Sequence, residues 1–543
     1  MRQYTVRCVL LLSVCVFCPI LFCDALVTHR VSDNFEEDLT LTPLSDGKLL
    51  AHFEFTTDFE AHVQPGTPIS DYGLFPKAIG QVLQEYDVRE MHLTFTQGRW
   101  NYGEWGYCPS QSAGTGVELW AWMKNSANVD AHWKSFTNVL SGLFCASLNF
   151  IDETLTTEPR LSFQPEAIHD NPFLPNTTNS QLRYGSLPHE NSGIAVLLNA
   201  HKIYNSNFHS MAIHAKSSCM DETCSRRRLE LKQTVTSVMD PVRETDRRDW
   251  SLQSIFDRQL TSACPVARQS RALVALNDEI HQTAQLSPSP HATLPADEAS
   301  AIFSKDKRPR SLAVYDLKKV TGHLDISMSW NEAMFQYPRE AKDPMISAQR
   351  YFTGYGQERG GLRITIENRN EHESVPMIYY DSIPWFLKFY LHTLEVDVIG
   401  NTTDKDDIIQ EMYYQPAIDR GRPTMLECRL LIPAKSMVTL SLDFDKVFLK
   451  YTEHRPDANR GFDVGSAVLT MWMENNTNSR SPRTMRLYTD TLLVSLPTPD
   501  FSMPYNVITL TCTVIALFFG SLFNLLIRSF QVVEPEAKTK KDD

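Results

Sequence analysis

The chain has 543 residues and a formal net charge of −13 at pH 7, because 65 Asp and Glu residues outnumber 52 Lys and Arg residues. A chain of this length predicts two or three domains. The acidic balance, without a basic stripe interleaved with aromatic residues, excludes nucleic acid as an expected partner.

The N-terminus has the features of a secretory signal peptide. Arg2 and Arg7 precede the apolar run 9–22, and the small residue Ala25 follows it. A basic segment, an apolar segment and a small residue in this order are typical of a cleaved signal. We expect residues 1–25 to be removed, which places the mature N-terminus in the lumen of the secretory pathway.

Residues 26–282 are predicted to form a first lumenal domain, a sheet with covering helices. Three of its segments alternate apolar and polar residues, as half-buried strands do: 49–55, 91–96 and 117–123. Helical spacing of apolar residues predicts a helix at 77–86 and a longer one at 130–151. The longer helix is expected to cover one face of the sheet.

Other parts of this domain are less regular. Residues 99–107 form a loop with four aromatic side chains, which fits either a contact surface or a lid folded back on the sheet. Further along, 193–198 is predicted as a buried strand, and helices are predicted at 228–239 and 251–260.

Six cysteines lie between the signal peptide and the C-terminal apolar segment, and four of them are disulfide candidates: Cys145, Cys219, Cys224 and Cys264. Cys219 and Cys224 could bond to each other or separately to Cys145 and Cys264. Zinc is not expected, because no second pair or suitably spaced histidines supply the remaining ligands. Cys145 falls on the apolar side of the predicted helix, which predicts a buried or disulfide-bonded thiol.

Composition changes to Pro, Ser, Ala and charged residues at 283–311, which predicts a linker or mobile loop. Beyond it, residues 312–500 contain a series of alternating segments parted by turn residues, without helices between them. This pattern predicts a second lumenal domain, an antiparallel β-sandwich. The fold class is therefore mainly β with some α (α+β): β-sandwich-type lumenal domains and one C-terminal transmembrane helix.

The C-terminal part predicts a membrane anchor. After a short juxtamembrane neck at 501–506, residues 507–527 contain no charged side chain. As a helix, this segment extends roughly 32 Å, enough to cross the hydrocarbon core of a bilayer. The basic residues of the tail, 528–543, place it in the cytosol, so a single-pass type I protein is predicted.

The tail carries Lys540 and Lys541 at the fourth and third positions from its end, a spacing that resembles the dilysine signal for retrieval to the endoplasmic reticulum. Alternatively, these lysines only enforce the topology or meet anionic headgroups. Three asparagines, each in an N-glycosylation sequon, are glycan candidates in this topology: Asn176, Asn401 and Asn475.

The sequence contains no motif of a catalytic site. HExxH, GxSxG and GxxxxGK are absent, and the glycines at 354–360 have the wrong spacing for a dinucleotide fingerprint. We therefore predict no catalytic residue, no metal and no cofactor, and interpret the chain as a membrane-tethered binding or assembly protein.

Several segments resemble the PIG-T family, the non-catalytic lumenal subunits of the glycosylphosphatidylinositol (GPI) transamidase. The clearest is SLPTPDFSMPYNV at 495–507, and others follow the family order at 93–100, 117–120, 138–152, 349–356, 383–393, 414–420 and 486–489. The resemblance implies a structural subunit that holds the cysteine-protease-like catalytic subunit, PIG-K, together with PIG-S, PIG-U and an aminopeptidase-like subunit. It also implies residence in the endoplasmic reticulum membrane, with proproteins and GPI lipid as substrates of the complex.

The chain departs from the family pattern at 182–198. Family members such as the vertebrate ones carry a longer loop there, with a cysteine that bonds the catalytic subunit, whereas this segment has none. Either the partner is held without that disulfide, or another exposed cysteine replaces it, with Cys108 of the aromatic loop as the first candidate. Two alternatives of other classes are a lumenal cargo receptor and a hydrolase whose active site is assembled from distant residues.

Overall fold

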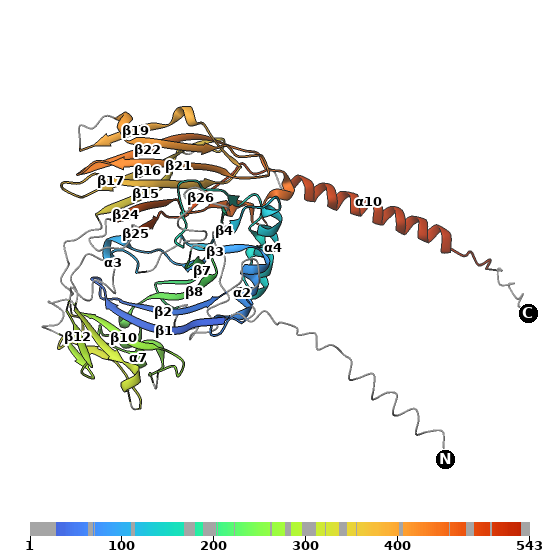
Figure 1. Cartoon of the computed structure of the whole chain (residues 1–543). Coiled ribbons are helices and arrows are strands. Elements are labelled where there is room, and N and C mark those ends of the chain that lie inside the picture. Colours follow the sequence, from blue (N-terminus) through green and yellow to red (C-terminus); the bar gives the residue numbers. More distant parts are fainter. Residues whose placement is uncertain are drawn as a thin grey trace, which may run out of the picture.

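The computed structural model describes residues 29–62, 69, 71–109, 114–167, 180–187, 202, 205–221, 223–260, 263–276, 284–295, 311–320, 322–335, 345–354, 356–400, 405–455, 457–473, 483–499 and 502–533. The predicted signal peptide, the three glycan candidates Asn176, Asn401 and Asn475, and Lys540 and Lys541 lie outside these residues. Two β-rich bodies pack against each other, and a single long helix projects from them (Figure 1).

The first body, residues 29–335, is built on an eleven-stranded sheet with the order β12-β13-β10-β1-β2-β8-β7-β3-β4-β6-β5. The strands are β1 (His29–Pro43), β2 (Leu49–His62), β3 (Val88–Gln97), β4 (Gly116–Lys124), β5 (Thr156–Thr157), β6 (Ser180–Leu187), β7 (Phe208–Cys219), β8 (Arg226–Met239), β10 (Gln269–Leu276), β12 (Ala292–Leu294) and β13 (Ser311–Asp316). Neighbours are antiparallel except β1 and β10, which run parallel.

Two helices cover one face of this sheet, as the sequence predicts. α2 (Lys77–Glu85) follows Pro76, and α4 (Val129–Phe144) ends at Cys145 in the left-handed conformation. The inward side chains of α4, Trp133, Phe136 and Leu140, recur at intervals of three and four and join the core formed with β2, β3, β4, β7 and β8.

The segment 228–239 is a strand, so the predicted helix is wrong. It pairs with β2 on one side and with β7 on the other, over the whole of its length. Leu229 and Leu231 are both buried in the core beneath the helices, a spacing of two that suits a strand. The predicted helix at 251–260 is reduced to α7 (Leu252–Phe256).

The boundary between the bodies falls later than the predicted linker. β12 and β13 belong to the first sheet, and a small sheet joins β11 (Gln285–Ser287), β14 (Ser327–Ser329) and β9 (Trp250–Ser251). Its strand β14 contributes Met328 to a core shared with β1, β2, β10 and β13. The described parts of 283–311 and residues 312–335 are thus part of the first body, because their apolar side chains complete its core.

The second body, residues 345–499, is a sandwich of two five-stranded sheets, as predicted. One joins β15 (Ile346–Thr353), β16 (Arg359–Asn368), β22 (Ser436–Lys446), β18 (Leu387–Phe389) and β19 (Glu395–Ile399). The other has the order β20 (Ile409–Gln415), β21 (Thr424–Ile432), β17 (Val375–Ile383), β24 (Val468–Met473) and β25 (Arg483–Tyr488). Alternate residues of both sheets, such as Ile364 and Leu430, form one core.

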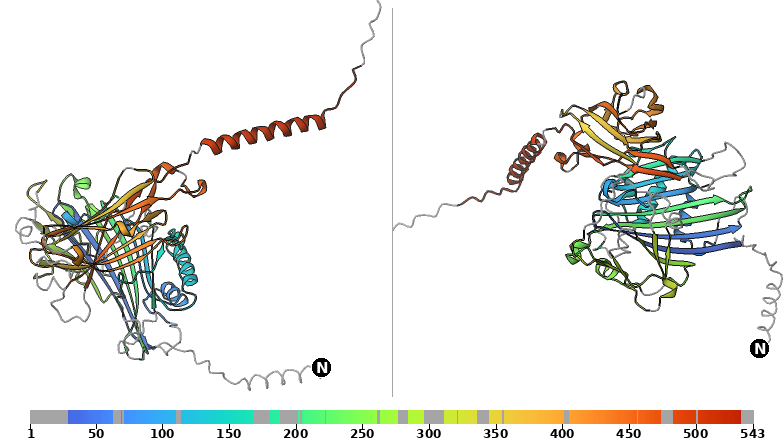
Figure 2. Two further views of the ribbon diagram at one scale, coloured as in Figure 1. Left: turned by 90° about the horizontal axis from the view of Figure 1, so that it is seen from above. Right: turned by 90° about the vertical axis from the view of Figure 1, so that its left-hand side faces the viewer.

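A pair of short strands, β23 (Phe462–Val464) and β26 (Leu492–Val494), precedes α10 (Ser502–Ile527). Residues 505–527 of α10 are long and apolar enough to span a membrane, and no part of this stretch is buried against the bodies (Figure 2). The predicted neck residues 502–506 form the first turn of the same helix, so no flexible joint separates them from the span.

The core beneath α4 allows a test of this architecture. Phe136→Ala should lower the free energy of unfolding by about 3–5 kcal/mol, because it removes a fully buried ring. Val139→Ala on the same helix should cost well under about 1 kcal/mol, since Val139 is 36% exposed. Urea unfolding followed by tryptophan fluorescence would measure both, and equal losses would contradict the packing.

Candidate functional site

Strand β4 is buried on both faces, and this sets the contact between the bodies. Val117, Leu119 and Ala121 face the core beneath the helices. Trp120, on the opposite face, packs with Tyr380 and Val468 of the second body. A strand buried on both sides becomes apolar at nearly every position, which explains the run of large side chains around Glu118.

Glu118 is a carboxyl group buried at this contact. The hydroxyl of Tyr488, from β25, donates a hydrogen bond of 2.8 Å to it, and that of Tyr184, from β6, donates one of 3.2 Å. Burial raises the pKa of Glu118 to about 7, although both hydrogen bonds and the positive charge of Arg486 favour the ionised form. The carboxyl group therefore links strands of both bodies and titrates near neutral pH.

Arg486 fills the space beside Glu118. Its guanidinium lies 4.8 Å from the ring centroid of Trp120 and 5.0 Å from that of Phe163, close enough for cation–π attraction. One of its nitrogens is 3.9 Å from a carboxylate oxygen of Glu166. A side chain of the second body is thus enclosed by three side chains of the first.

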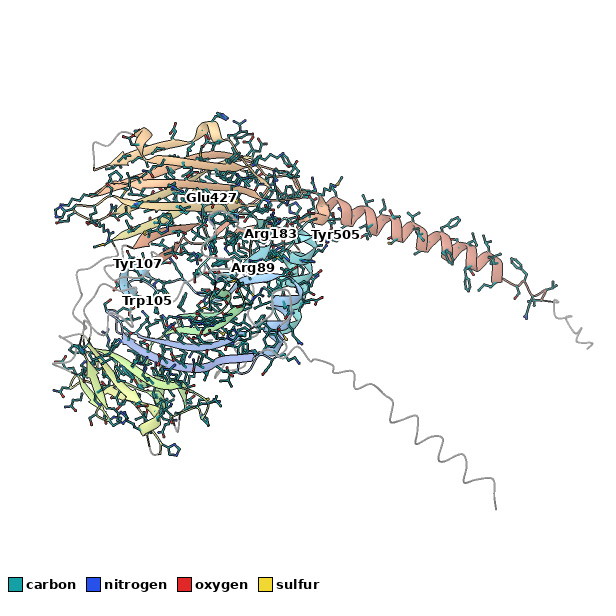
Figure 3. The ribbon with its side chains drawn as sticks, viewed as in Figure 1. Arg89, Trp105, Tyr107, Arg183, Glu427 and Tyr505 are labelled. Carbon is teal, nitrogen blue, oxygen red and sulfur yellow. A yellow bond between two sulfur atoms is a disulfide. The ribbon has the colours of Figure 1, made fainter. Side chains whose placement is uncertain are left out.

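The segment 156–167 runs between the bodies and binds the second through its backbone. Glu427, fully buried on β21, accepts hydrogen bonds from the amide groups of Arg160 at 2.7 Å and Ser162 at 2.9 Å (Figure 3). Thr157 and Tyr380 share a hydrogen bond of 2.6 Å between hydroxyl groups. A carboxylate that accepts several hydrogen bonds from backbone amides holds residues 156–167, the strap, in one conformation.

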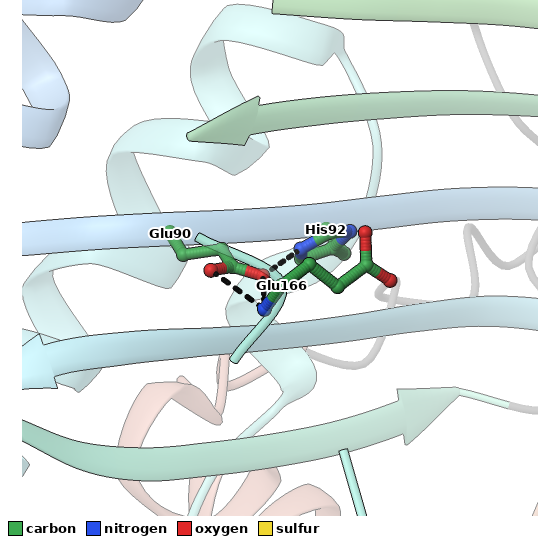
Figure 4. Close-up of side chains that lie close together, drawn as sticks. All are labelled: Glu90, His92 and Glu166. Atoms are coloured by element: carbon green, nitrogen blue, oxygen red, sulfur yellow. Dashed lines mark hydrogen bonds and ion pairs between the residues drawn. The ribbon is translucent and has the colours of Figure 1, made fainter. Parts of the chain in front are cut away.

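One group of side chains lies close enough together to hold a metal ion, among the residues that the structure describes (Figure 4). It consists of Glu90, His92 and Glu166. His92 stacks on Trp120 with 3.7 Å between ring centroids and shares a 2.7 Å hydrogen bond with His214. The other ring nitrogen of His92 is 2.7 Å from Glu90.

The atoms of this group that could coordinate a metal already take part in hydrogen bonds or ion pairs within the protein. Glu90 accepts hydrogen bonds from the backbone amides of Glu166 and Ala167, and Lys216 lies 2.7 Å from Glu166. Burial opposes ionisation of Glu166, but the charges of His92, Lys216 and Arg486 hold its pKa well below the usual range. The ammonium group of Lys216 already balances the negative charge of Glu166, as a metal ion would. These residues therefore fit a closed hydrogen-bond network better than a metal site.

The aromatic loop folds back on the sheet, which confirms the lid and contradicts a contact surface at its tryptophans. Trp100 and Trp105 pack on Phe208 with ring centroids 5.0 and 6.3 Å away, and Trp105 is the last residue of the short helix α3 (Tyr102–Trp105). The amide of Tyr488 donates a hydrogen bond of 3.0 Å to the hydroxyl of Tyr102. The loop thereby adds another contact between the bodies.

The cysteines separate into different environments. Cys219 and Cys224 form a disulfide, the local alternative of the two predicted, and Cys264 is half-buried. Cys145 is exposed and not disulfide-bonded, so the prediction of a buried or bonded thiol is wrong. The helix α4 ends before Cys145, and the left-handed backbone conformation of this residue directs its side chain away from the core. Cys108 is buried beside the two loop tryptophans, contrary to the expectation of exposure.

Sequence reasoning missed the network around Glu118. The available signal was a glutamate between large apolar residues in an otherwise apolar strand, which indicates a buried polar partner. Nothing local identified that partner, because Tyr488 is 370 positions away.

Comparisons with known proteins cover both bodies and α10. The Gpi16 family, described as "Gpi16 subunit, GPI transamidase component", matches residues 19–249 and 241–543. The human GPI-anchor transamidase component PIGT is 37% identical over 552 residues, covering 93% of this chain and 92% of that protein. GPI16 of Saccharomyces cerevisiae and the PIG-T homolog of Schizosaccharomyces pombe are each 31% identical, covering 93% and 94% of this chain and 90% and 94% of those proteins.

The raised pKa of Glu118 predicts a pH dependence of stability. The folded chain keeps a proton on Glu118 up to about pH 7, whereas the unfolded chain loses it near 4.5, so stability falls as pH rises between these values. The loss should reach about 3 kcal/mol and be missing from Glu118→Gln.

Urea unfolding of both proteins at pH 4.5, 6 and 7.5 would measure the difference. The exposed Glu395→Gln is the control, expected to follow the wild-type curve. Parallel curves for wild type and Glu118→Gln would contradict the titration assigned to Glu118.

Proposed function

We propose a structural role within a larger enzyme, on the premise that this chain belongs to the Gpi16 family of GPI transamidase components. The chain scaffolds the cysteine-protease-like catalytic subunit, PIG-K, which attaches GPI anchors to proproteins in the endoplasmic reticulum. The observation that carries the proposal is the family match, which extends over both bodies and the apolar helix rather than over one domain.

The arrangement of the described residues supports a non-catalytic role. A group of buried ionisable side chains lies in and beside the contact between the bodies, where each named carboxylate is hydrogen-bonded to tyrosines, backbone amides or cations. Such groups fix the relative position of two bodies, which is what a scaffold requires. The thiol attack and the aminolysis by the lipid's amine then belong to the catalytic partner.

The topology proposed is single-pass type I. Both bodies would lie in the lumen and α10 would cross the endoplasmic reticulum membrane, with residues 528–543 in the cytosol. PIG-S, PIG-U and the aminopeptidase-like subunit are the further partners proposed, and the substrates of the assembly are a proprotein and a GPI lipid. The three sequons and the two terminal lysines keep their proposed roles as glycan and retrieval signals.

Purification of the tagged full-length chain in mild detergent tests the proposed function. A scaffold should co-purify in fixed ratio with a cysteine-protease-like subunit, as measured by mass spectrometry. A cargo receptor would instead bring exchangeable cargo in variable amounts, and a hydrolase would cleave peptide or glycolipid on its own. A stable complex without a cysteine-protease-like subunit would contradict the proposal.

The environment of Cys108 bears on how the catalytic partner is held. Because its side chain is buried in the same cluster as Trp100 and Trp105, we propose that the partner is held without a disulfide to Cys108. Cys108→Ser should leave the mobility of the complex on non-reducing gels unchanged. Cys145→Ser, at an exposed thiol, is the matched variant, and a covalent species that disappears only in Cys108→Ser would contradict the proposal.

A further inference from the structure

The loop that follows β22 exposes large apolar side chains. Phe448 is 67% exposed and Tyr451 is 41% exposed, although both belong to the compact second body. Lys450, between them, is exposed as well. The loop thus presents an aromatic ring, a phenol hydroxyl and an ammonium group together at the surface.

The loop is held in a defined conformation. The amide of Val447 donates a hydrogen bond of 3.0 Å to the carbonyl of Phe386. The amide of Lys450 donates one of 2.8 Å to Glu453, which also pairs with Arg420. The exposure of Phe448 therefore belongs to an ordered surface rather than to a loose chain.

The position of the loop beside α10 indicates which surroundings it contacts. The side chain of Tyr451 hydrogen-bonds to that of Tyr505, the first residue of the 23-residue apolar stretch. Figure 3 shows Tyr505 where α10 leaves the second body. That stretch is about 34 Å long as a helix, close to the ~30 Å hydrocarbon core, so Tyr505 lies at the boundary of the core. Phe448 is three residues from Tyr451, within roughly 11 Å along an extended chain.

We infer that residues 447–451 contact the lipid headgroup layer of the bilayer that α10 spans. Tyrosine and lysine at this depth place their polar ends in the headgroups, and Phe448 buries its ring among the upper acyl carbons. Because α10 already tethers the loop, its insertion is intramolecular and needs no strong intrinsic affinity. Together the loop and α10 form two attachment points, which fix the tilt of the second body over the membrane.

The inference rests on the span and not on the transamidase role, so the two can fail separately. A partner subunit seated on the loop is the competing occupant. The bilayer is favoured because Tyr451 of the loop contacts Tyr505, at the start of a helix long and apolar enough to span a membrane.

Photo-crosslinking of the full-length chain tests the contact. The benzophenone amino acid p-benzoylphenylalanine would replace Phe448, and the purified protein would be reconstituted alone in phosphatidylcholine vesicles and irradiated. The matched control is the same replacement at Ile399, which is 65% exposed. Ile399 pairs with Met437 at the far end of β22, roughly 30 Å from Lys446, where the loop begins.

Mass spectrometry should find at least about fivefold more lipid adduct at position 448 than at position 399. Equal adduct at the two positions would overturn the inference, as would a protein adduct in place of the lipid adduct when the assembled complex is irradiated. If the variant at 448 does not fold, the same probe at the exposed Lys450 gives the same comparison.

Discussion

Burial of strand β4 on both faces is the constraint on which the arrangement depends. Helices cover one face, and the second body covers the other, so Glu118 must find hydrogen-bond donors inside the protein. Tyr184 and Tyr488 supply them from the two bodies. Loss of the second body would remove the Tyr488 donor from Glu118 and uncover the apolar face of β4 around Trp120, so the two bodies form one unit rather than independent modules on a linker.

Features encoded by local pattern could be predicted from the sequence. The apolar length of α10, the helical spacing in α4 and the alternation in the second body each need only a short window of residues. The prediction of a helix at 228–239 was wrong because a short window of residues does not determine the structure there. Leucines at 229 and 231 and valines at 235 and 238 fit more than one period, and pairing with β2 and β7 decided in favour of a strand.

The contact between the bodies could not be predicted, because its partners are far apart in the chain. Glu427 and the strap amide of Ser162 are 265 positions apart, and neither residue has a distinctive neighbourhood. The predicted domain boundary differs from the observed one for a similar reason. The stretch 283–311 is rich in Pro and Ser like a linker, and only the pairing of β12 with β13 shows that part of it belongs to the first sheet. The resemblance to a family, by contrast, rests on long segments and predicted the membership that the comparisons show.

The same distance along the chain determines when the contact can form during synthesis. Tyr488 is made 370 residues after Glu118, which at about 5–20 residues per second is a delay of roughly 20–75 s. Throughout that interval the second face of β4, with Trp120 and its buried acid, has no partner from the second body. The nascent chain must therefore pass through a stage in which this face is open to chaperones, and the final docking step comes only when translation has nearly reached α10.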